Sequence, residues 1–69
     1  MDMPIIQSVD RALQILDLFN EQNPELKITE ISNKLDLHKS TTHSLLKTLK
    51  ARQYIKQDPD SGKYSLGLK

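Results

Sequence analysis

The sequence predicts a small, mainly α-helical domain with one β-hairpin, arranged as a winged helix-turn-helix with three helices followed by the wing. Three observations predict it. Apolar residues recur at helical spacing in three segments before residue 52. A short turn separates the second segment from the third, as in a helix-turn-helix. After residue 53, apolar and polar residues alternate around the turn sequence "DPDSG". The 69 residues are expected to form one domain, with the helix-turn-helix over about 28–50 and the wing over about 54–68.

The first helix is expected to begin after Ser8, a good N-cap residue, and to run to about Gln22. Its apolar stripe follows the i, i+3, i+4, i+7 rule and consists of Val9, Ala12, Leu13, Ile15, Leu16 and Phe19. The sequence "NPE" at 23–25 should stop the helix, because the residue before a proline is pushed out of the helical region. Residues 26–28 alternate apolar and polar side chains, which is typical of a short strand.

Thr29 is the expected N-cap of the second helix, which presents Ile31 and Leu35 to the core and ends near Asp36. Residues 37–39 then turn the chain into the third helix. One side of that helix is expected to face the core and carries Thr42, Leu45, Leu46 and Leu49.

Two strands, within "YIKQ" and "KYSLGL", are expected to flank a five-residue tip at 58–62. Tyr64 and Leu66 share one face of the second strand and are expected in the core. Tyr54 and Ile55 should join the hairpin to the third helix.

The net charge of +1 hides a strong asymmetry along the chain. Residues 1–36 hold three basic and seven acidic side chains (net −4), whereas residues 37–69 hold seven basic and two acidic side chains (net +5). A basic half is what a polyanion-binding surface needs, although a solvated charged face explains the same count. The chain has no cysteine, no apolar run long enough to span a bilayer and no signal peptide, so a cytoplasmic location is expected.

The side of the third helix opposite its leucines is polar and almost free of acid. Short hydroxyls near its N-terminal end allow close approach to a major groove, and lysines further along suit phosphates. The expected contacts with bases or adjacent phosphates are Lys39, Ser40, Thr41, His43 and Ser44, with Lys47 on a phosphate. An ordinary solvated surface is the alternative. It is disfavoured because serine and threonine lower helix propensity on an exposed face.

The hairpin tip is a second candidate contact region. Ser61 and Lys63 can reach a phosphate or a minor groove, and Gly62 allows close backbone approach. Asp58 and Asp60 would oppose such a contact, so a plain turn with incidental charge is an equal alternative.

Metal binding and catalysis find little support in the sequence. His38 and His43 are five residues apart, which does not place them on one helix face at the i, i+4 distance, and no carboxylate cluster completes a site. No nucleophile, base and orienting acid are grouped, and there is no glycine-rich phosphate loop. We therefore expect neither an enzyme nor a cofactor.

Four sequence motifs also resemble one known family. "SVDRALQILDLF", "ITEISNKLDL", "KSTTHSLLKTL" and "YSLGL" together are similar to the N-terminal DNA-binding domain of the IclR family of bacterial transcriptional regulators, over about residues 8–68. The resemblance implies binding to double-stranded operator DNA as a homodimer. It also implies a small-molecule effector acting through a C-terminal domain that this chain lacks. The runner-up is a winged helix that serves as a protein-protein interaction module, which predicts an apolar patch on the third helix or the wing.

Three positions depart from the family pattern. Ser44 stands where the family usually has arginine, so sequence specificity is expected to differ from that of many relatives. Asp36 and Gln53 stand where glycine is usual, which predicts modest strain in two turns. Because the first helix contributes to the family's dimer interface, Leu18 and the "MPII" segment at 3–6 are candidates for that interface. A single exposed leucine without a role is the alternative.

Overall fold

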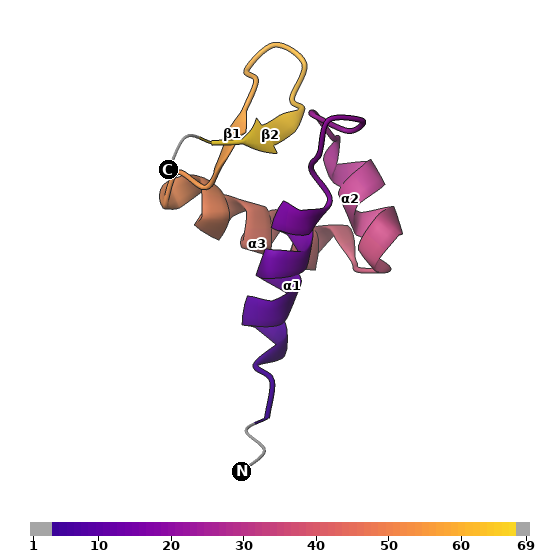
Figure 1. Ribbon diagram of the computed structural model, residues 1–69, viewed down its shortest axis with the longest axis vertical. Helices are drawn as coiled ribbons and strands as arrows, with labels where there is room; N and C mark the ends of the chain where they lie inside the picture. The colour runs from indigo at the N-terminus through magenta and orange to yellow at the C-terminus, as the bar shows by residue number, and fades with distance from the viewer. Residues whose placement is uncertain (1–3, 68–69) are drawn as a thin grey trace.

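The computed structural model describes residues 4–67 and has three helices followed by a two-stranded antiparallel hairpin (Figure 1). The elements in chain order are α1 (Gln7–Asp17), α2 (Ile28–Leu35), α3 (Lys39–Ala51), β1 (Ile55–Gln57) and β2 (Tyr64–Leu66). The hairpin follows α3 and folds back over the C-terminal part of that helix, and α1 crosses α3 with its N-terminal end projecting from the body. This arrangement confirms the predicted winged helix-turn-helix.

Both predicted ends of the first helix are wrong. The helix begins at Gln7, and its N-cap is Ile6, so Ser8 lies inside the first turn and caps nothing. It ends at Asp17 because the chain turns before it reaches the proline. The side-chain oxygen of Asn20 accepts hydrogen bonds from the backbone N–H groups of Gln22 (2.9 Å) and Asn23 (2.8 Å), which replaces helical bonding there.

The predicted cap of α2 is also displaced, since Lys27, not Thr29, holds the N-cap position. The Glu30 carboxylate accepts a hydrogen bond from the Lys27 backbone N–H at 2.9 Å. A lysine side chain has no acceptor, so only this half of a capping box forms. The strand predicted at 26–28 is reduced to a single bridge in which Leu26 and Tyr64 exchange backbone hydrogen bonds of 2.9 and 2.8 Å. That bridge ties the segment before α2 to the wing.

Strands β1 and β2 pair Ile55 with Leu66 and Gln57 with Tyr64. The connection between them spans residues 58–63, one residue more than expected. Tyr64 is buried as predicted, but Leu66 is 44% exposed and Tyr54 is 45% exposed. Leu66 only borders a shallow hollow beside the loop that follows α1, so its assignment to the core was wrong.

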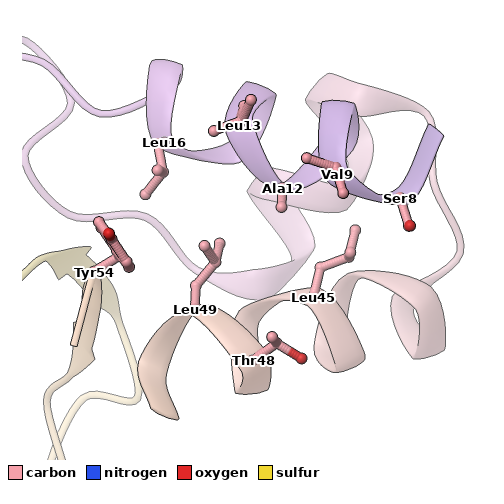
Figure 2. A pocket seen from close by; sticks show the side chains of 9 residues that line it. All are labelled: Ser8, Val9, Ala12, Leu13, Leu16, Leu45, Thr48, Leu49 and Tyr54. Carbon is pink, nitrogen blue, oxygen red and sulfur yellow. The ribbon is translucent and has the colours of Figure 1, made fainter. Parts of the chain in front are cut away.

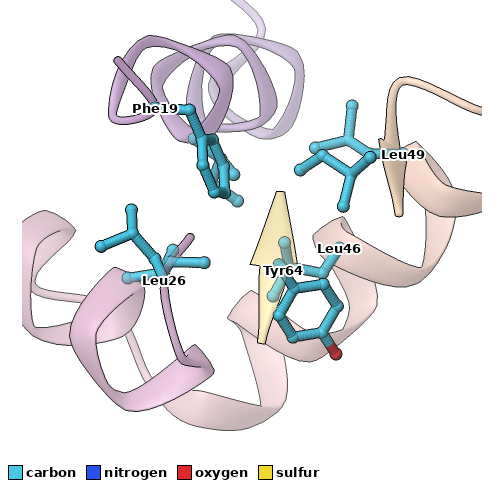
Figure 3. Close-up of a cluster of buried hydrophobic side chains, with 8 residues drawn as sticks. Phe19, Leu26, Leu46, Leu49 and Tyr64 are labelled. Carbon is cyan, nitrogen blue, oxygen red and sulfur yellow. The ribbon is translucent and has the colours of Figure 1, made fainter. Parts of the chain in front are cut away.

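The core gathers side chains from every element (Figure 3). It consists of Ile15, Phe19, Leu26, Ile31, Leu46, Leu49, Ile55 and Tyr64. Full burial of one such side chain stabilises the fold by roughly 1.5–3 kcal/mol, so these few residues dominate the stability of a short chain. Thr42 is fully buried beside them, as predicted, and its hydroxyl donates a 3.0 Å hydrogen bond to the His38 carbonyl oxygen.

The apolar stripe of α1 is only partly covered. Ile15 is fully buried, but Val9 and Leu13 are each 54% exposed. Leu18 lies just after α1, is half-buried and packs against the core, so it is not the exposed leucine that the sequence suggested. Ile5 and Ile6 of the "MPII" segment are exposed, and its Met3 lies outside the described residues.

Candidate nucleic-acid interface

Helix α3 separates its two faces as its sequence predicts. Thr42, Leu46 and Leu49 are buried against the other elements. The predicted contact residues on the opposite side are exposed, namely Lys39, Ser40, His43, Ser44 and Lys47, whereas Thr41 is half-buried. The outward face therefore offers hydroxyls and an imidazole near its N-terminal end and a lysine one turn further along.

The N-terminal end of α3 is electropositive and open. His38 holds the N-cap position in an extended conformation and makes no side-chain cap, and the first turn contains no acidic residue. The first backbone N–H groups of a helix have no partner within it, and the helix dipole adds positive potential at this end. This end of α3 is therefore suited to a negatively charged group such as a phosphate.

The turn that aims α3 depends on Asp36 in the left-handed conformation, with φ 54° and ψ 51°. The N–H of Leu37 donates to the carbonyl oxygen of Ser32 at 2.9 Å, and the N–H of Asp36 donates to that of Asn33 at 3.3 Å. This pair of bonds is a Schellman motif, which usually contains glycine at the left-handed position. The sequence correctly marked this residue as one that carries positive φ.

The wing tip, residues 58–63, places Ser61 in solvent and leaves Lys63 half-buried. The Asp58 carboxylate accepts a hydrogen bond from the Ser61 backbone N–H at 2.8 Å. Hydrogen bonds from Ser61, first from its side chain and then from its backbone, hold the pKa of the Asp58 carboxyl below its ordinary value. Asp58 thus has a structural role in the turn beside the two candidate contact residues.

A hydrogen-bonded connection between α3 and the wing was missed from the sequence. Lys50 Nζ donates to Gln57 Oε1 at 3.3 Å, and Gln57 Nε2 donates to the Gly62 carbonyl oxygen at 3.1 Å. The sequence does contain a signal for it. Side chains alternate along a strand, so Gln57 points to the same face of β1 as the buried Ile55. A polar residue at an inward strand position calls for a partner.

An apolar groove runs between α1 and α3 (Figure 2). Val9, Ala12 and Leu16 of α1 point toward Leu45 and Leu49 of α3. Tyr54 stands at one end, and Ser8, Leu13 and Thr48 complete the lining. The residues of α3 that line the groove, Leu45, Thr48 and Leu49, are not among the predicted contact residues. The groove joins the exposed part of the α1 stripe.

Two further properties concern the described part of the chain only. Within residues 4–67, no helix has the length and apolar character required to cross a bilayer. The same residues bring no three histidine or carboxylate side chains together at a spacing suited to a metal ion.

Comparison with known proteins places this geometry in a family. Residues 8–59 match the model of the IclR helix-turn-helix domain. The HTH-type transcriptional regulator XynR of Escherichia coli K12 is 70% identical over 67 residues, which cover 97% of this chain and 27% of that regulator. The glycerol operon regulatory protein of Streptomyces griseus is 39% identical over 62 residues, which cover 90% of this chain and 24% of that protein.

Solved structures agree with the sequence matches. An IclR family transcriptional regulator from Brucella abortus superposes with a TM-score of 0.91 at 33% identity, over 97% of this chain and 26% of that one. An IclR-type regulator from Alicyclobacillus acidocaldarius gives 0.89 at 32% identity, over 93% of this chain and 26% of that one. The chain thus spans about a quarter of the length of these proteins.

Proposed function

The chain belongs to the IclR helix-turn-helix family, and we propose from the geometry of α3 that it binds double-stranded operator DNA sequence-specifically as part of a bacterial transcriptional regulator. The observation that carries the proposal is the outward face of α3. That face is exposed, free of acid in its first turn and bounded by an open helix N-terminus. Relatives named as transcriptional regulators support the same function.

In this proposal α3 enters the major groove with its N-terminal turns nearest the bases. Ser40, His43 and Ser44 hydrogen-bond base edges or adjacent phosphates, together with Lys39 and the half-buried Thr41. Lys47, one turn further along, neutralises a phosphate. Because Ser44 is short, its hydrogen bond reaches only a base edge that lies close to the helix backbone.

The wing provides the second contact. Ser61 and Lys63 lie on one hydrogen-bonded tip and meet the backbone or the adjacent minor groove. Asp58 keeps its negative charge beside this contact, because hydrogen bonds from its own turn favour the carboxylate form. Its side chain orders the tip that presents Ser61 and Lys63.

The apolar groove between α1 and α3 supports binding as a homodimer. Val9, Leu13 and Tyr54 expose apolar surface along it, and none of them belongs to the proposed DNA-contacting set. Two copies that share this surface would read half-sites one helical turn, about 34 Å, or a multiple apart. We place the protein in the cytoplasm, with the DNA, and assign any response to a small-molecule effector to the portion of such regulators that this chain does not match.

The proposal is tested by selecting bound duplexes from a random pool and titrating the selected duplex at two salt concentrations, with random duplex as competitor. We expect enrichment of one sequence and a steep fall in affinity with salt, because each neutralised phosphate contributes about −0.9 to the slope of log K against log salt. No enrichment, or equal affinity at both salt concentrations, contradicts it.

Two variants separate the roles within α3. Lys47→Ala should weaken binding to selected and random duplexes alike and reduce the salt slope by about 1. Ser44→Ala should instead relax selection at particular base pairs, by roughly 1–3 kcal/mol for each lost base contact. Lys27→Ala is the matched control for Lys47→Ala, because it removes an exposed lysine that precedes α2 and lies outside the proposed face.

A further inference from the structure

The tip of the wing is one hydrogen-bonded unit. The N–H of Asp58 donates to the Lys63 carbonyl oxygen at 2.9 Å, and the N–H of Gly62 donates to the Asp58 carbonyl oxygen at 2.8 Å. The N–H of Lys63 donates to the Ser61 hydroxyl oxygen at 3.2 Å. Ser61 and Lys63, the two candidate DNA-contacting residues of the wing, therefore belong to the same rigid unit. Any interaction that fixes the tip fixes both residues.

The side chain of Gln57 fastens this unit to α3. Its amide nitrogen donates to the Gly62 carbonyl oxygen at 3.1 Å, while its amide oxygen accepts from Lys50 Nζ at 3.3 Å. An ammonium group only donates and a carbonyl oxygen only accepts, so a single orientation of the amide satisfies both partners. Gln57 is half-buried and pairs with Tyr64 in the sheet, so its own backbone is held firmly.

Gly62 completes the connection through its backbone conformation. Its φ of 75° lies in the left-handed region, where side-chain-bearing residues are strained. Space does not require glycine here, because an added Cβ would have Gln57 Nε2 as its nearest neighbour at 4.0 Å. The glycine thus permits the turn that presents its carbonyl oxygen to Gln57.

We propose that Gln57 is a positioning residue, whose amide fixes the wing tip relative to the C-terminal end of α3 so that both DNA-contacting regions dock at a fixed spacing. The inference rests on the proposed DNA binding. A tip that is ordered before binding avoids the conformational entropy cost of ordering on the DNA. In this arrangement Lys50 supports the wing, and Lys47 is the lysine that serves as the phosphate contact.

The first experiment needs no DNA. Backbone ¹⁵N relaxation is measured for the wild-type chain and for Gln57→Leu, Gln57→Glu and Lys50→Met. Gln57→Leu removes both hydrogen bonds of the amide. Gln57→Glu keeps an acceptor for Lys50 but loses the donor to the Gly62 carbonyl oxygen. Lys50→Met removes only the hydrogen bond between α3 and Gln57. Lys56→Met is the matched control, since it removes a lysine from the neighbouring strand position, which points to the other face of the hairpin.

We expect the order parameters of Ser61, Gly62 and Lys63 to fall from about 0.85 toward 0.6 in both Gln57 variants, with the core amides unchanged. Lys50→Met should give an intermediate loss, and Lys56→Met none. A tip that stays as ordered in Gln57→Leu as in the wild type overturns the proposal. If Gln57→Leu loses order throughout the chain, the result for Gln57→Glu decides, because glutamate is nearly isosteric with glutamine.

The second experiment places the tip on DNA. A cleavage reagent is attached through Asp60→Cys, an exposed tip position whose side chain takes no part in the hydrogen bonds above. On the selected duplex we expect the chain with Gln57 to cut a narrow range of nucleotides and Gln57→Leu to cut a broad range. Gln57→Leu should also bind the duplex with about three- to ten-fold lower affinity. Equally narrow cleavage in both overturns the proposal. A chain that binds no duplex overturns the proposed function instead, and the relaxation result then stands independently.

Discussion

At the scale of single residues, the two turns that hold α3 in place contain left-handed residues other than glycine. Gln53, with φ 69°, follows α3 in a second Schellman motif, in which its N–H donates to the Lys50 carbonyl oxygen and the N–H of Tyr54 donates to that of Leu49. Asp36, with φ 54°, holds the equivalent position after α2. An L-residue in this conformation costs roughly 1–2 kcal/mol. Replacing it with glycine removes this cost, but the gain is partly offset because glycine has more conformational freedom in the unfolded chain.

Gln53→Gly should therefore stabilise the chain by about 0.5–1 kcal/mol, and Asp36→Gly by less, because short polar residues tolerate the left-handed region better. The free energy of unfolding is measured by urea denaturation. Gln53→Ala is the matched control, since it keeps a Cβ and should bring no gain. A midpoint for Gln53→Gly at or below that of Gln53→Ala would show that the turn is not strained.

Gly67 is required for a different reason, which is close packing against the turn after α3. Its N–H donates to the Tyr54 carbonyl oxygen at 2.8 Å, and an added Cβ would lie 2.3 Å from the Gln53 carbonyl oxygen. Gly67→Ala should lower the free energy of unfolding by about 1–3 kcal/mol, because backbone must move to admit the methyl group. Leu66→Ala, at the exposed neighbouring position, is the control in the same urea denaturation, and an equal loss in both variants would rule out the clash.

At the scale of elements, periodicity predicted which segments form helices and strands, but not where they end. The ends depend on single hydrogen bonds that the periodic pattern does not reveal, such as those accepted by Asn20 after α1 and by Glu30 in the first turn of α2. Burial was predicted well where neighbours on several sides cover a position, as at Thr42. The prediction for Leu66 was wrong, because a periodic pattern shows which face is apolar but not whether anything covers it. The exposed Leu13 on the apolar stripe of α1 illustrates the same limit of the pattern.

One part of the candidate site could be predicted from the sequence, and another part could not. The outward face of α3 could be predicted because a regular helix fixes the direction of each side chain once its core side is known. The connection from Lys50 through Gln57 to Gly62 could not be predicted with the same ease, since it joins two elements whose relative placement depends on the turn at Gln53.

The wing should carry a local dependence on acid pH. The pKa of the Asp58 carboxyl is lowered by hydrogen bonds from Ser61, so the charged form is favoured in the folded tip. A lowered folded pKa contributes stability above the unfolded value, near 3.9, and that contribution is lost as pH falls through the folded pKa. The Ser61 amide shift, followed by NMR from pH 6 to pH 2, should titrate with a midpoint below about 3.9. Asp58→Asn should remove this transition, and a midpoint above the unfolded value would contradict the assignment.

At the scale of the whole molecule, surfaces of three kinds are separated. Seven of the ten basic residues belong to the half that contains α3 and the wing, whereas seven of the nine acidic residues belong to the half that contains α1 and α2. Such a charge distribution steers a protein toward a polyanion with its basic side foremost. The apolar surface of α1, with Tyr54, lies apart from the proposed DNA-contacting face, so one copy can use both surfaces at once.

That separation gives the proposed homodimer a direct test. Leu13 is 54% exposed on α1 and lines the groove, so Leu13→Glu should leave the fold intact while placing a charge in the shared surface. Sedimentation velocity with a duplex carrying two selected half-sites should show two wild-type copies bound together. The Leu13→Glu variant should bind as single copies, with lower affinity because a carboxylate would be buried without a partner.

Leu66→Glu is the matched control, because Leu66 is 44% exposed on the wing and lies outside the groove. It should leave the stoichiometry at two copies, since it adds the same charge to an apolar surface that the dimer does not use. Equal disruption by both variants would indicate a general effect of added negative charge near DNA. Single-copy binding by the wild type at every concentration would show that the α1 groove does not join two copies, and it would leave the contact residues of α3 and the wing as the whole of the interface.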